Sequence, residues 1–375
     1  MNILVVFTYG YSIKTWFESG TLNRELSIYR NLSERFNINF TFLTYGDSSE
    51  HTFNLESLNI KVIPIYENLH LSNYKLINYF YSFLIPFKLK NLFSNVSLIK
   101  QNQLHGAWVS IILKNLIKKP LFLRTGYDMY LFSVNDKKKA LISFLYKILT
   151  MLSLKTADLY SVTSQSEYIF IKNKYSFKKN KLVVRPNWIL NSNSKISPER
   201  YENRVITVGR LESQKNYELL INIFANTHYQ VDIIGEGSER DYLEKLARLK
   251  NVHVNFLGNK KNEEIIELLK KYKFYFSTSK FEGNPKSLLE ALSTSCLVFA
   301  TDIDNHKEII TNGVNGYLFS INNKDFYKEF SKIINNSENV EKIVKEGYKR
   351  VSENNSLDTS TVKEFEDYKK LIDSA

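Results

Sequence analysis

The sequence has almost no cysteine and no long hydrophobic run. Cys296 is the one cysteine among 375 residues, which excludes an internal disulfide and agrees with a reducing compartment. The first residues, MNILVVFTYGYS, have neither a basic segment nor a small-residue cleavage site, so no secretory signal is expected. The uninterrupted apolar runs are shorter than the about 20 residues that a membrane-spanning helix needs. We therefore expect a cytoplasmic protein.

Positive charge is concentrated in the first half of the chain. Residues 1–190 contain 24 Lys and Arg against 11 Asp and Glu, whereas residues 191–375 contain 27 against 28. A basic half suggests nucleic acid or anionic lipid as a partner. The lysines here alternate with long aliphatic runs and no aromatic RNA-binding motif is present, so nucleic acid is not an expected partner.

Two stretches of the first half are unusually apolar. In residues 140–155 Ser143, Lys147 and Thr150 form a narrow polar stripe at helical spacing, and residues 75–93 are aromatic, end in lysines and contain Pro86. Two interpretations remain open. These stretches are either buried helices of an α/β domain or surfaces for peripheral contact with an anionic membrane at its inner face.

Short β-branched runs alternate with longer helical patterns, which is typical of parallel α/β domains. In the first half the expected strands lie at 2–8, 38–44, 60–65, 96–100, 121–125, 159–163 and 181–185. In the second half they lie at 204–208, 230–235, 252–258, 274–279 and 296–301. The polar segment 191–203 interrupts this pattern and is the expected linker. The pattern predicts two doubly wound, Rossmann-like parallel-sheet domains that face each other across a cleft.

The stretch KFEGNPKSLLEAL, residues 280–292, places Glu282 before a turn and Glu290 in the helix that follows. Asn284 is a good helix cap and Pro285 suits the first helical position. The next N–H groups then lack intrahelical partners, and a helix N-terminus after a parallel strand is a site for phosphate. The alternative is an ordinary surface pair between Lys286 and Glu290, with Glu282 solvated.

A second candidate group lies in VITVGRLESQKN, residues 205–216. An expected strand ends at Gly209, Arg210 follows it, and Lys215 lies just before the next helical pattern. A guanidinium contacts phosphate with two hydrogen bonds and an ammonium adds a point charge. Either cation alone is more often a solvated surface charge, but together with the glutamate-flanked turn they predict a diphosphate site.

These motifs resemble those of the retaining group 1 glycosyltransferases, family 4. The resemblance runs from Val205 to Phe319 through VGRLESQKN, DIIGEGSERDYLEKL, VNFLGN, FSTSKFEGNPKSLLEAL and VFATDIDNHKEIITNGVNGYLF. The family's Glu-x7-Glu signature falls on Glu282 and Glu290. The resemblance implies the two-domain GT-B fold. It also implies an acceptor domain at 1–195, a nucleotide-sugar donor domain at 196–355, and a helix at 356–375 that packs back on the first domain.

The resemblance also implies roles for single residues. Arg210 and Lys215 would hold the donor diphosphate, Glu282 would contact the transferred sugar, and Glu290 would bind the ribose. Gly20, in WFESGTLNREL, would approach the phosphates from the other domain. The implied catalytic residues are Glu282, Arg210 and Lys215, and the implied nucleotide-sugar site is Gly20, Gly209, Arg210, Lys215, Glu282, Gly283, Asn284, Pro285, Lys286, Ser287, Leu288 and Glu290.

The expected function is retaining, hexosyltransferase-type transfer. A UDP- or GDP-linked sugar would pass to a hydroxyl of a polysaccharide or lipid-linked oligosaccharide in cell-envelope synthesis. The leaving phosphate would help to deprotonate the acceptor, so no protein nucleophile, metal or other cofactor is expected. Asp302 and Asp304 have the DxD spacing that binds a divalent metal in another glycosyltransferase fold. Here they continue the family pattern, so metal binding is not expected. The alternatives are a sugar-nucleotide epimerase of the same fold and a non-catalytic nucleotide-sugar scaffold.

The sequence departs from the family pattern in three places. Many members have a histidine after the strand that matches LFLRTGYDMY, and this chain has none between Arg124 and Asp128. Ser295 and Leu297 replace a family glycine and proline, and residues 304–305 replace a glycine pair. We expect small backbone adjustments at these positions.

Overall fold

The computed structural model describes residues 1–69, 71–136, 139–178, 181–190 and 199–374. The chain forms two compact units, one of Met1–Pro186 with Ser360–Ala375 and one of Asn187–Thr359. Most of the predicted linker, residues 191–198, lies outside the described residues. Its predicted end was wrong, because strand β8 already begins at Tyr201.

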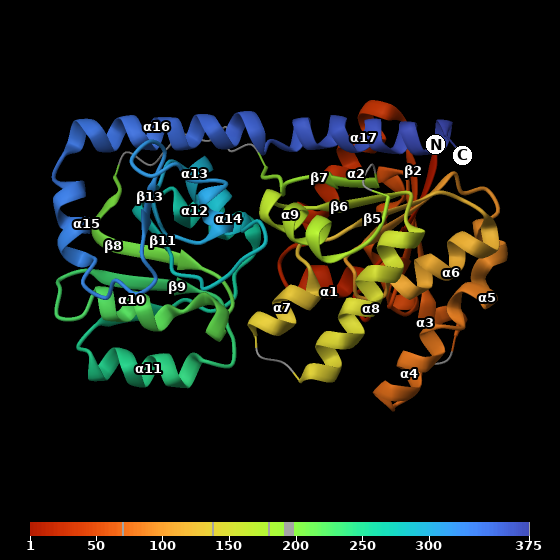
Figure 1. Ribbon diagram of the computed structural model, residues 1–375, viewed down its shortest axis with the longest axis horizontal. Helices are drawn as coiled ribbons and strands as arrows, with labels where there is room; N and C mark the ends of the chain where they lie inside the picture. Colours follow the sequence, from red (N-terminus) through yellow and green to blue (C-terminus); the bar gives the residue numbers. More distant parts are fainter. Residues whose placement is uncertain (70, 137–138, 179–180, 191–198, 375) are drawn as a thin grey trace. The chain divides into compact units, whose positions relative to one another are not determined.

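The first unit contains a seven-stranded sheet in the order β3-β2-β1-β4-β5-β6-β7, in which every pair is parallel. Its strands are β1 Asn2–Val6, β2 Asn39–Thr44, β3 Ile60–Pro64, β4 Leu98–Asn102, β5 Leu121–Arg124, β6 Leu159–Val162 and β7 Leu182–Val184. Its helices are α1 Ile13–Glu18, α2 Leu22–Phe36, α3 Ile65–Asn68, α4 Lys75–Ser82, α5 Ile85–Leu89, α6 Ala107–Ile117, α7 Met129–Asn135, α8 Ala140–Thr156, α9 Gln165–Lys174 and α17 Leu357–Asp373 (Figure 1).

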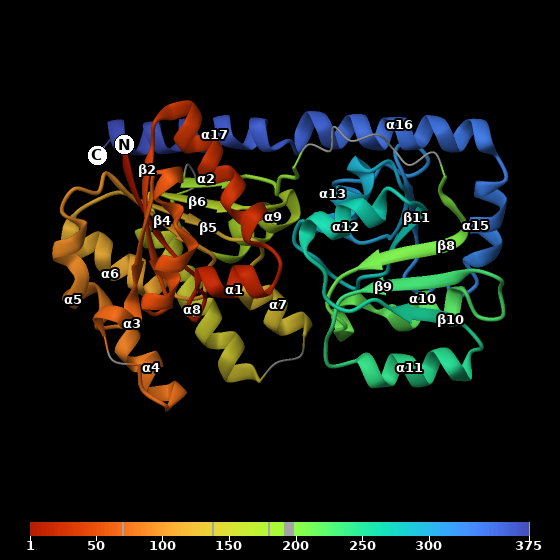
Figure 2. The same ribbon diagram turned by 180° about the vertical axis from the view of Figure 1, so that it is seen from behind.

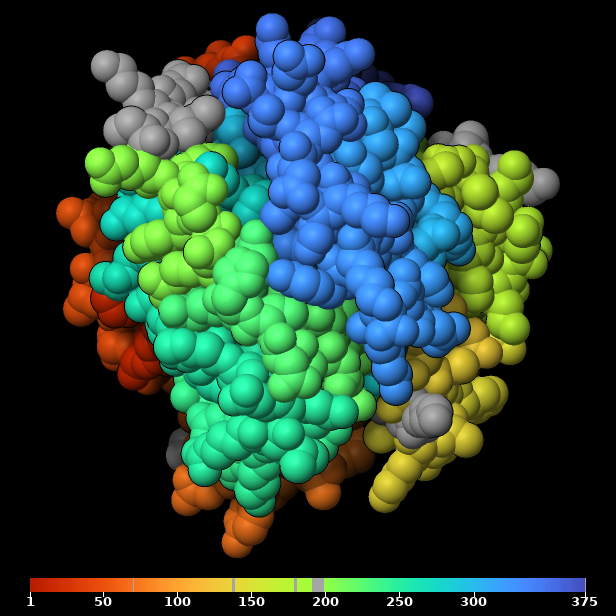
Figure 3. All heavy atoms as spheres, turned by 90° about the vertical axis from the view of Figure 1, so that its left-hand side faces the viewer, coloured from red at the N-terminus to blue at the C-terminus, as the bar shows by residue number. Residues whose placement is uncertain are grey.

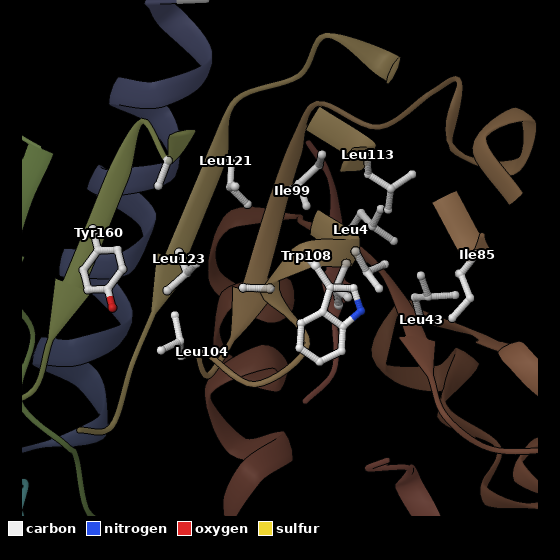
Figure 4. Close-up of a cluster of buried hydrophobic side chains, with 14 of the residues drawn as sticks. Leu4, Leu43, Ile85, Ile99, Leu104, Trp108, Leu113, Leu121, Leu123 and Tyr160 are labelled. Carbon is white, nitrogen blue, oxygen red and sulfur yellow. The ribbon is translucent and has the colours of Figure 1, made fainter. Parts of the chain in front are cut away.

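Alternation of side chains along these strands supplies apolar groups to both faces of the sheet. On one face Leu121 and Leu123 of β5 pack with Ile99 of β4 and with Trp108 of α6 (Figure 4). On the other face Phe122 meets Tyr368 of α17, with ring centroids 6.0 Å apart. The C-terminal helix therefore covers the first unit's sheet, although it is the last helix of the chain.

Ion pairs fasten α17 to this sheet. The Lys100 ammonium of β4 bonds to the Glu364 carboxylate, and both side chains are buried. Arg185, directly after β7, donates two hydrogen bonds to Asp367, of 2.7 and 2.6 Å. A buried charge needs such a partner, because removing one member leaves the other unpaired in a poorly solvated site.

The second unit contains a six-stranded parallel sheet in the order β10-β9-β8-β11-β12-β13. Its strands are β8 Tyr201–Val208, β9 Gln230–Ile234, β10 His253–Phe256, β11 Tyr272–Ser277, β12 Leu297–Thr301 and β13 Tyr317–Phe319. Its helices are α10 Tyr217–Ile223, α11 Arg240–Leu249, α12 Asn262–Leu269, α13 Lys286–Ser293, α14 Asp304–Lys307, α15 Tyr327–Ile334 and α16 Ser337–Asn354 (Figure 2).

Two separate cores lie on the two faces of this second sheet. Phe274 and Phe276 of β11 point into a cluster with α10, α11 and α15, while Tyr275 between them points into a cluster with α12, α13 and α16. Helices α15 and α16 lie against each other and form the blue ridge of the space-filling view (Figure 3). The prediction of doubly wound, parallel-sheet units is confirmed.

All twelve predicted strands are present, with ends that shift by up to three residues. Strand β13, Tyr317–Phe319, was not predicted. In the part of the chain that the structure describes, no helix is both long and apolar enough to cross a membrane.

Candidate active site

The candidate site lies at the carboxyl ends of β8 and β11, which are neighbours in the second sheet. From β8 the chain continues to β9 on one side, and from β11 it continues to β12 on the other. Strand order therefore reverses between these two strands. In doubly wound sheets ligands bind at this switch point, outside the carboxyl ends of the strands.

Gly209, directly after β8, lets the chain bring Lys215 close to the strand end. A Cβ atom at this position would lie 2.9 Å from Lys215 Cε and 2.8 Å from the Tyr217 hydroxyl. Gly235, directly after β9, lies so close that a Cβ atom added to it would lie 2.1 Å from the Gly209 carbonyl oxygen. Both positions require glycine because backbone or a catalytic candidate occupies the space of a side chain.

Glu282 is held at the centre of a small polar network. Its Oε1 lies 2.5 Å from Lys215 Nζ and accepts a 2.7 Å hydrogen bond from Ser279 Oγ. Gln214 Nε2 donates to the Phe281 carbonyl at 2.8 Å and to Glu282 Oε2 at 3.3 Å. The Glu282 side chain is only 8% exposed, so these contacts replace most of its water.

These neighbours determine the charge state of Glu282. Burial acts to raise the pKa of its carboxyl, but the ion pair and hydrogen bond with Lys215, and then the bond from Ser279, outweigh burial and hold the pKa below its usual value. Glu282 is therefore ionised at neutral pH. It can accept hydrogen bonds from hydroxyl groups.

The hydrogen bonds that support Ser279, the partner of Glu282, were not identified from the sequence. Thr301, at the end of β12, donates its hydroxyl to the Ser279 carbonyl at 2.6 Å. The buried His306 contacts the Thr301 carbonyl through Nδ1 at 2.8 Å and the Ser277 hydroxyl through Nε2 at 3.1 Å. Burial lowers the pKa of His306, so it links the ends of β11 and β12 as a neutral ring. Only proximity in the fold shows this arrangement.

Arg210 differs from Lys215 in its surroundings. Its side chain is exposed, and no carboxylate of the described residues pairs with it, whereas Lys215 is paired with Glu282. Arg210 follows Gly209 at the same strand end. An exposed guanidinium at this edge is available for an anionic group.

Helix α13 begins at Lys286, and the predicted cap was wrong. The N-cap is Pro285, with no side-chain cap bond. Asn284 instead bonds to Asn187: its Oδ1 accepts from the Asn187 N–H at 2.9 Å and its carbonyl accepts from the Asn187 amide at 2.7 Å. The N-terminal end of α13 therefore follows a turn fixed from outside the helix, and its partial positive charge faces the same strand edge.

Glu290 lies inside α13 and is 3% exposed. Its Oε1 accepts a 2.9 Å hydrogen bond from Asn262 at the start of α12. The Lys286 ammonium, one turn earlier in α13, lies 4.7 Å from the Trp188 ring centroid. Tyr275 donates to Ser287 Oγ at 3.0 Å. Burial raises the pKa of Tyr275, and the charges of Glu282 and Glu290 act in the same direction. Both carboxylates therefore act on this one hydroxyl group through their charge.

Gly20 belongs to the first unit, in the turn between α1 and α2, where its φ of 69° suits glycine.

In the same unit, the segment without the family histidine forms a buried carboxylate network. Asp128 caps α7 through a 2.7 Å bond from the Leu131 N–H. Glu167 accepts the Asp128 N–H at 2.9 Å, and burial raises its pKa to about 8.

The second unit matches a known protein family. Residues 191–350 match the model of the group 1 glycosyl transferases. An uncharacterized glycosyltransferase of Methanocaldococcus jannaschii is 26% identical over 354 residues, covering 92% of this chain and 93% of the relative. An N-acetylgalactosaminyltransferase of Campylobacter jejuni that acts on a diphospho-undecaprenol-linked saccharide is 31% identical over 124 residues, which is 32% of this chain and 34% of that enzyme.

The solved structure of Anabaena HepE in complex with UDP and glucose superposes with a TM-score of 0.75 over 99% of this chain and 100% of that one, at 18% identity. This likeness shows the fold. The matches and the two parallel-sheet units together support a group 1 glycosyltransferase with the GT-B fold.

Proposed function

We propose that the protein transfers a hexose-type sugar from a nucleotide-diphosphate-sugar donor to an acceptor hydroxyl with retention of configuration. The observation that carries this proposal is the grouping of Gly209, Lys215 and Glu282 at the switch point, next to the exposed Arg210 and the N-terminal end of α13. Cations and a helix N-terminus suit a diphosphate. An ionised carboxylate beside them suits the hydroxyls of a sugar.

In the proposed reaction, negative charge develops on the leaving diphosphate. Arg210, Lys215 and the first N–H groups of α13 would stabilise that charge, and each prearranged donor of this kind contributes about 10²–10³ in rate. Glu282 would orient the sugar, and Glu290 would bind the ribose. Pairing with Lys215 keeps Glu282 charged, and the Ser279 and Gln214 contacts keep it in position.

We propose that the donor is UDP- or GDP-linked and that the acceptor is a polysaccharide or lipid-linked oligosaccharide at the inner face of a membrane. HepE, which shares the fold, was solved with UDP and glucose. The Campylobacter relative acts on a saccharide linked to diphospho-undecaprenol. Retention follows the resemblance to family 4 members and is part of the proposal.

The test is calorimetric binding of UDP, GDP, ADP and CMP to the full chain and to an Arg210→Ala/Lys215→Ala variant. We expect one diphosphate to bind and the variant to lose that binding at least tenfold. The matched control is Arg248→Ala, because Arg248 is 82% exposed on α11. Unchanged binding in the double variant would remove both cations from the site.

The same experiment, extended to the sugar nucleotides of that base, separates the alternatives. An epimerase would convert the nucleotide sugar without an acceptor, and a scaffold would bind it without turnover. Slow hydrolysis of the donor to a free sugar with the anomeric configuration retained supports the transferase.

A further inference from the structure

Helix α8 buries several hydroxyl side chains and exposes several large apolar ones, although Leu154 is buried and Lys147 is exposed. Ser143, Thr150 and Ser153 point inward and are at most 7% exposed, whereas Leu141 and Phe144 are 69% and 56% exposed. Surface helices normally bury their large apolar side chains and expose the polar ones. The Thr150 hydroxyl donates to Asp128 at 3.3 Å, so the inward polar face is used within the unit. The outward apolar side chains are exposed instead.

The α4–α5 segment also exposes large apolar side chains, although Ile85 and Leu89 of α5 are buried. Ser82 is 1% exposed and accepts a 2.8 Å hydrogen bond from the Trp108 indole N–H. On the outside, Leu76, Phe80 and Phe87 are 74%, 68% and 53% exposed. Single exposed apolar residues are common on proteins, but a group of large ones on neighbouring elements marks a contact surface.

These two segments adjoin within the first unit. Helix α6 packs against both α5 and α8. Tyr79 of α4 lies near Tyr146 of α8, and burial, together with this neighbour, raises the pKa of Tyr146. Both ribbon views show α4 and the start of α8 at the same end of this unit (Figures 1 and 2). We call the exposed side chains of Leu76, Phe80, Phe87, Leu141, Phe144 and Leu145 the α4–α8 surface.

The segments that carry this surface are positively charged, although Asp136, just before α8, is also exposed. No Asp or Glu occurs in residues 68–127 or in residues 137–157. The exposed lysines of these segments include Lys88 and Lys90 beside Phe87, and Lys147 on α8. Lys139 is the N-cap of α8, and the first turn of that helix has no acidic residue. A cation at this end opposes the helix dipole, so Lys139 does not stabilise α8 through the dipole.

We propose that the α4–α8 surface docks peripherally on a bilayer that contains anionic lipid, with its apolar side chains entering the interface and its lysines meeting lipid phosphates. Apolar area and positive charge together are what such binding requires. A second copy of the chain would bring lysines mostly against lysines, because the segments 68–127 and 137–157 contain no carboxylate. This inference adds a partner to the proposed function and does not depend on the donor site.

The test is sedimentation of the full chain with vesicles of phosphatidylcholine alone and of phosphatidylcholine with 30% phosphatidylglycerol. We expect binding to the anionic vesicles, weakened at least tenfold in Phe80→Ser/Phe144→Ser and reduced by 0.5 M salt. Lys88→Gln/Lys147→Gln should lower the salt-sensitive part. The matched control is Leu249→Ser, because Leu249 is 80% exposed on α11 of the second unit.

Thermal unfolding of each variant shows whether it is folded, and calorimetric nucleotide binding tests the donor site separately. Absence of binding to anionic vesicles would overturn the proposal, as would an equal loss in Leu249→Ser. A dimer in solution that Phe80→Ser/Phe144→Ser converts to monomer, without lipid binding by the parent chain, would overturn it in favour of a second copy.

Discussion

Lys215 Nζ and Glu282 Oε1 lie 2.5 Å apart, so two residues with separately predicted roles form one ion pair. The sequence resemblance gives the lysine to the diphosphate and the glutamate to the sugar. In the structure each side chain sets the charge environment of the other. A donor that places a phosphate near Lys215 would share this ammonium with Glu282. Arg210, which is exposed, is then the cation with most freedom to contact a phosphate.

Glu282→Gln should lower turnover by about 10² or more while nucleotide binding persists. The amide keeps the size of the side chain but loses the charge that pairs with Lys215 and accepts sugar hydroxyls. Donor consumption with saturating acceptor gives kcat, and thermal unfolding verifies the fold. The matched control is Glu244→Gln, which removes a surface carboxylate paired with Arg240 at 2.6 Å. Parental kcat in Glu282→Gln would show that this carboxylate has no role.

Thr301→Val should reduce kcat on the order of tenfold and leave nucleotide affinity unchanged. The valine keeps the shape but cannot donate to the Ser279 carbonyl, and Ser279 in turn positions Glu282. A misplaced group costs rate more than binding. Thr227→Val is the control, because its hydroxyl also donates to a backbone carbonyl, that of Phe224 at 2.9 Å. Equal effects of the two substitutions on kcat would contradict a positioning role.

Ser295→Gly should raise the free energy of unfolding by about 0.5–1 kcal/mol, because a non-glycine residue in the left-handed region is strained. Ser295 has a φ of 59° and replaces the family glycine. Its carbonyl accepts a 2.6 Å bond from Arg200, which the substitution keeps. Ser293→Gly, at the last residue of α13, should instead destabilise by about 1 kcal/mol, because glycine is a poor helix former and the bond from Ser293 Oγ to the Glu290 carbonyl is lost. Denaturant titration measures both, and a decrease in Ser295→Gly would show that the site is unstrained.

Glu167→Gln should reduce the loss of stability that accompanies a rise in pH. Burial raises the pKa of Glu167 from 4.5 to about 8, so the folded chain holds this proton more tightly than the unfolded chain does. Stability therefore falls as pH rises from about 4.5 to about 8 and levels off above that. Urea unfolding at pH 5, 6.5 and 8 measures the slope. An identical slope in the variant would show that Glu167 titrates normally.

Much of the fold could be predicted, because parallel strands buried on both faces are rich in β-branched and apolar residues. The glutamate-flanked turn, Gly209 and the two cations also stand out, since each occupies a strand end within a short segment. The cap at Asn284 could not be predicted correctly, because its partner Asn187 is 97 residues away. His306 and Thr301 act through contacts that no local pattern records.

Helix α8 illustrates a further limit of sequence reasoning. Ser143 and Thr150 form a polar stripe at helical spacing, and this periodicity correctly identifies a helix. It does not tell which face is inside. Of the predicted stripe, Ser143 and Thr150 are buried and Lys147 is exposed. Thr150 bonds to the buried Asp128, which is 22 residues away in the sequence.

The return of α17 to the first unit has a consequence for synthesis on the ribosome. The sheet of that unit ends at Val184, but Glu364 and Asp367 are its partners for Lys100 and Arg185. At about 5–20 residues per second, roughly 9–35 s pass between translation of these two regions. During that interval Lys100 lacks its partner Glu364. The second unit, by contrast, needs no residue beyond Thr359. The unit that is translated first is therefore the last to be completed.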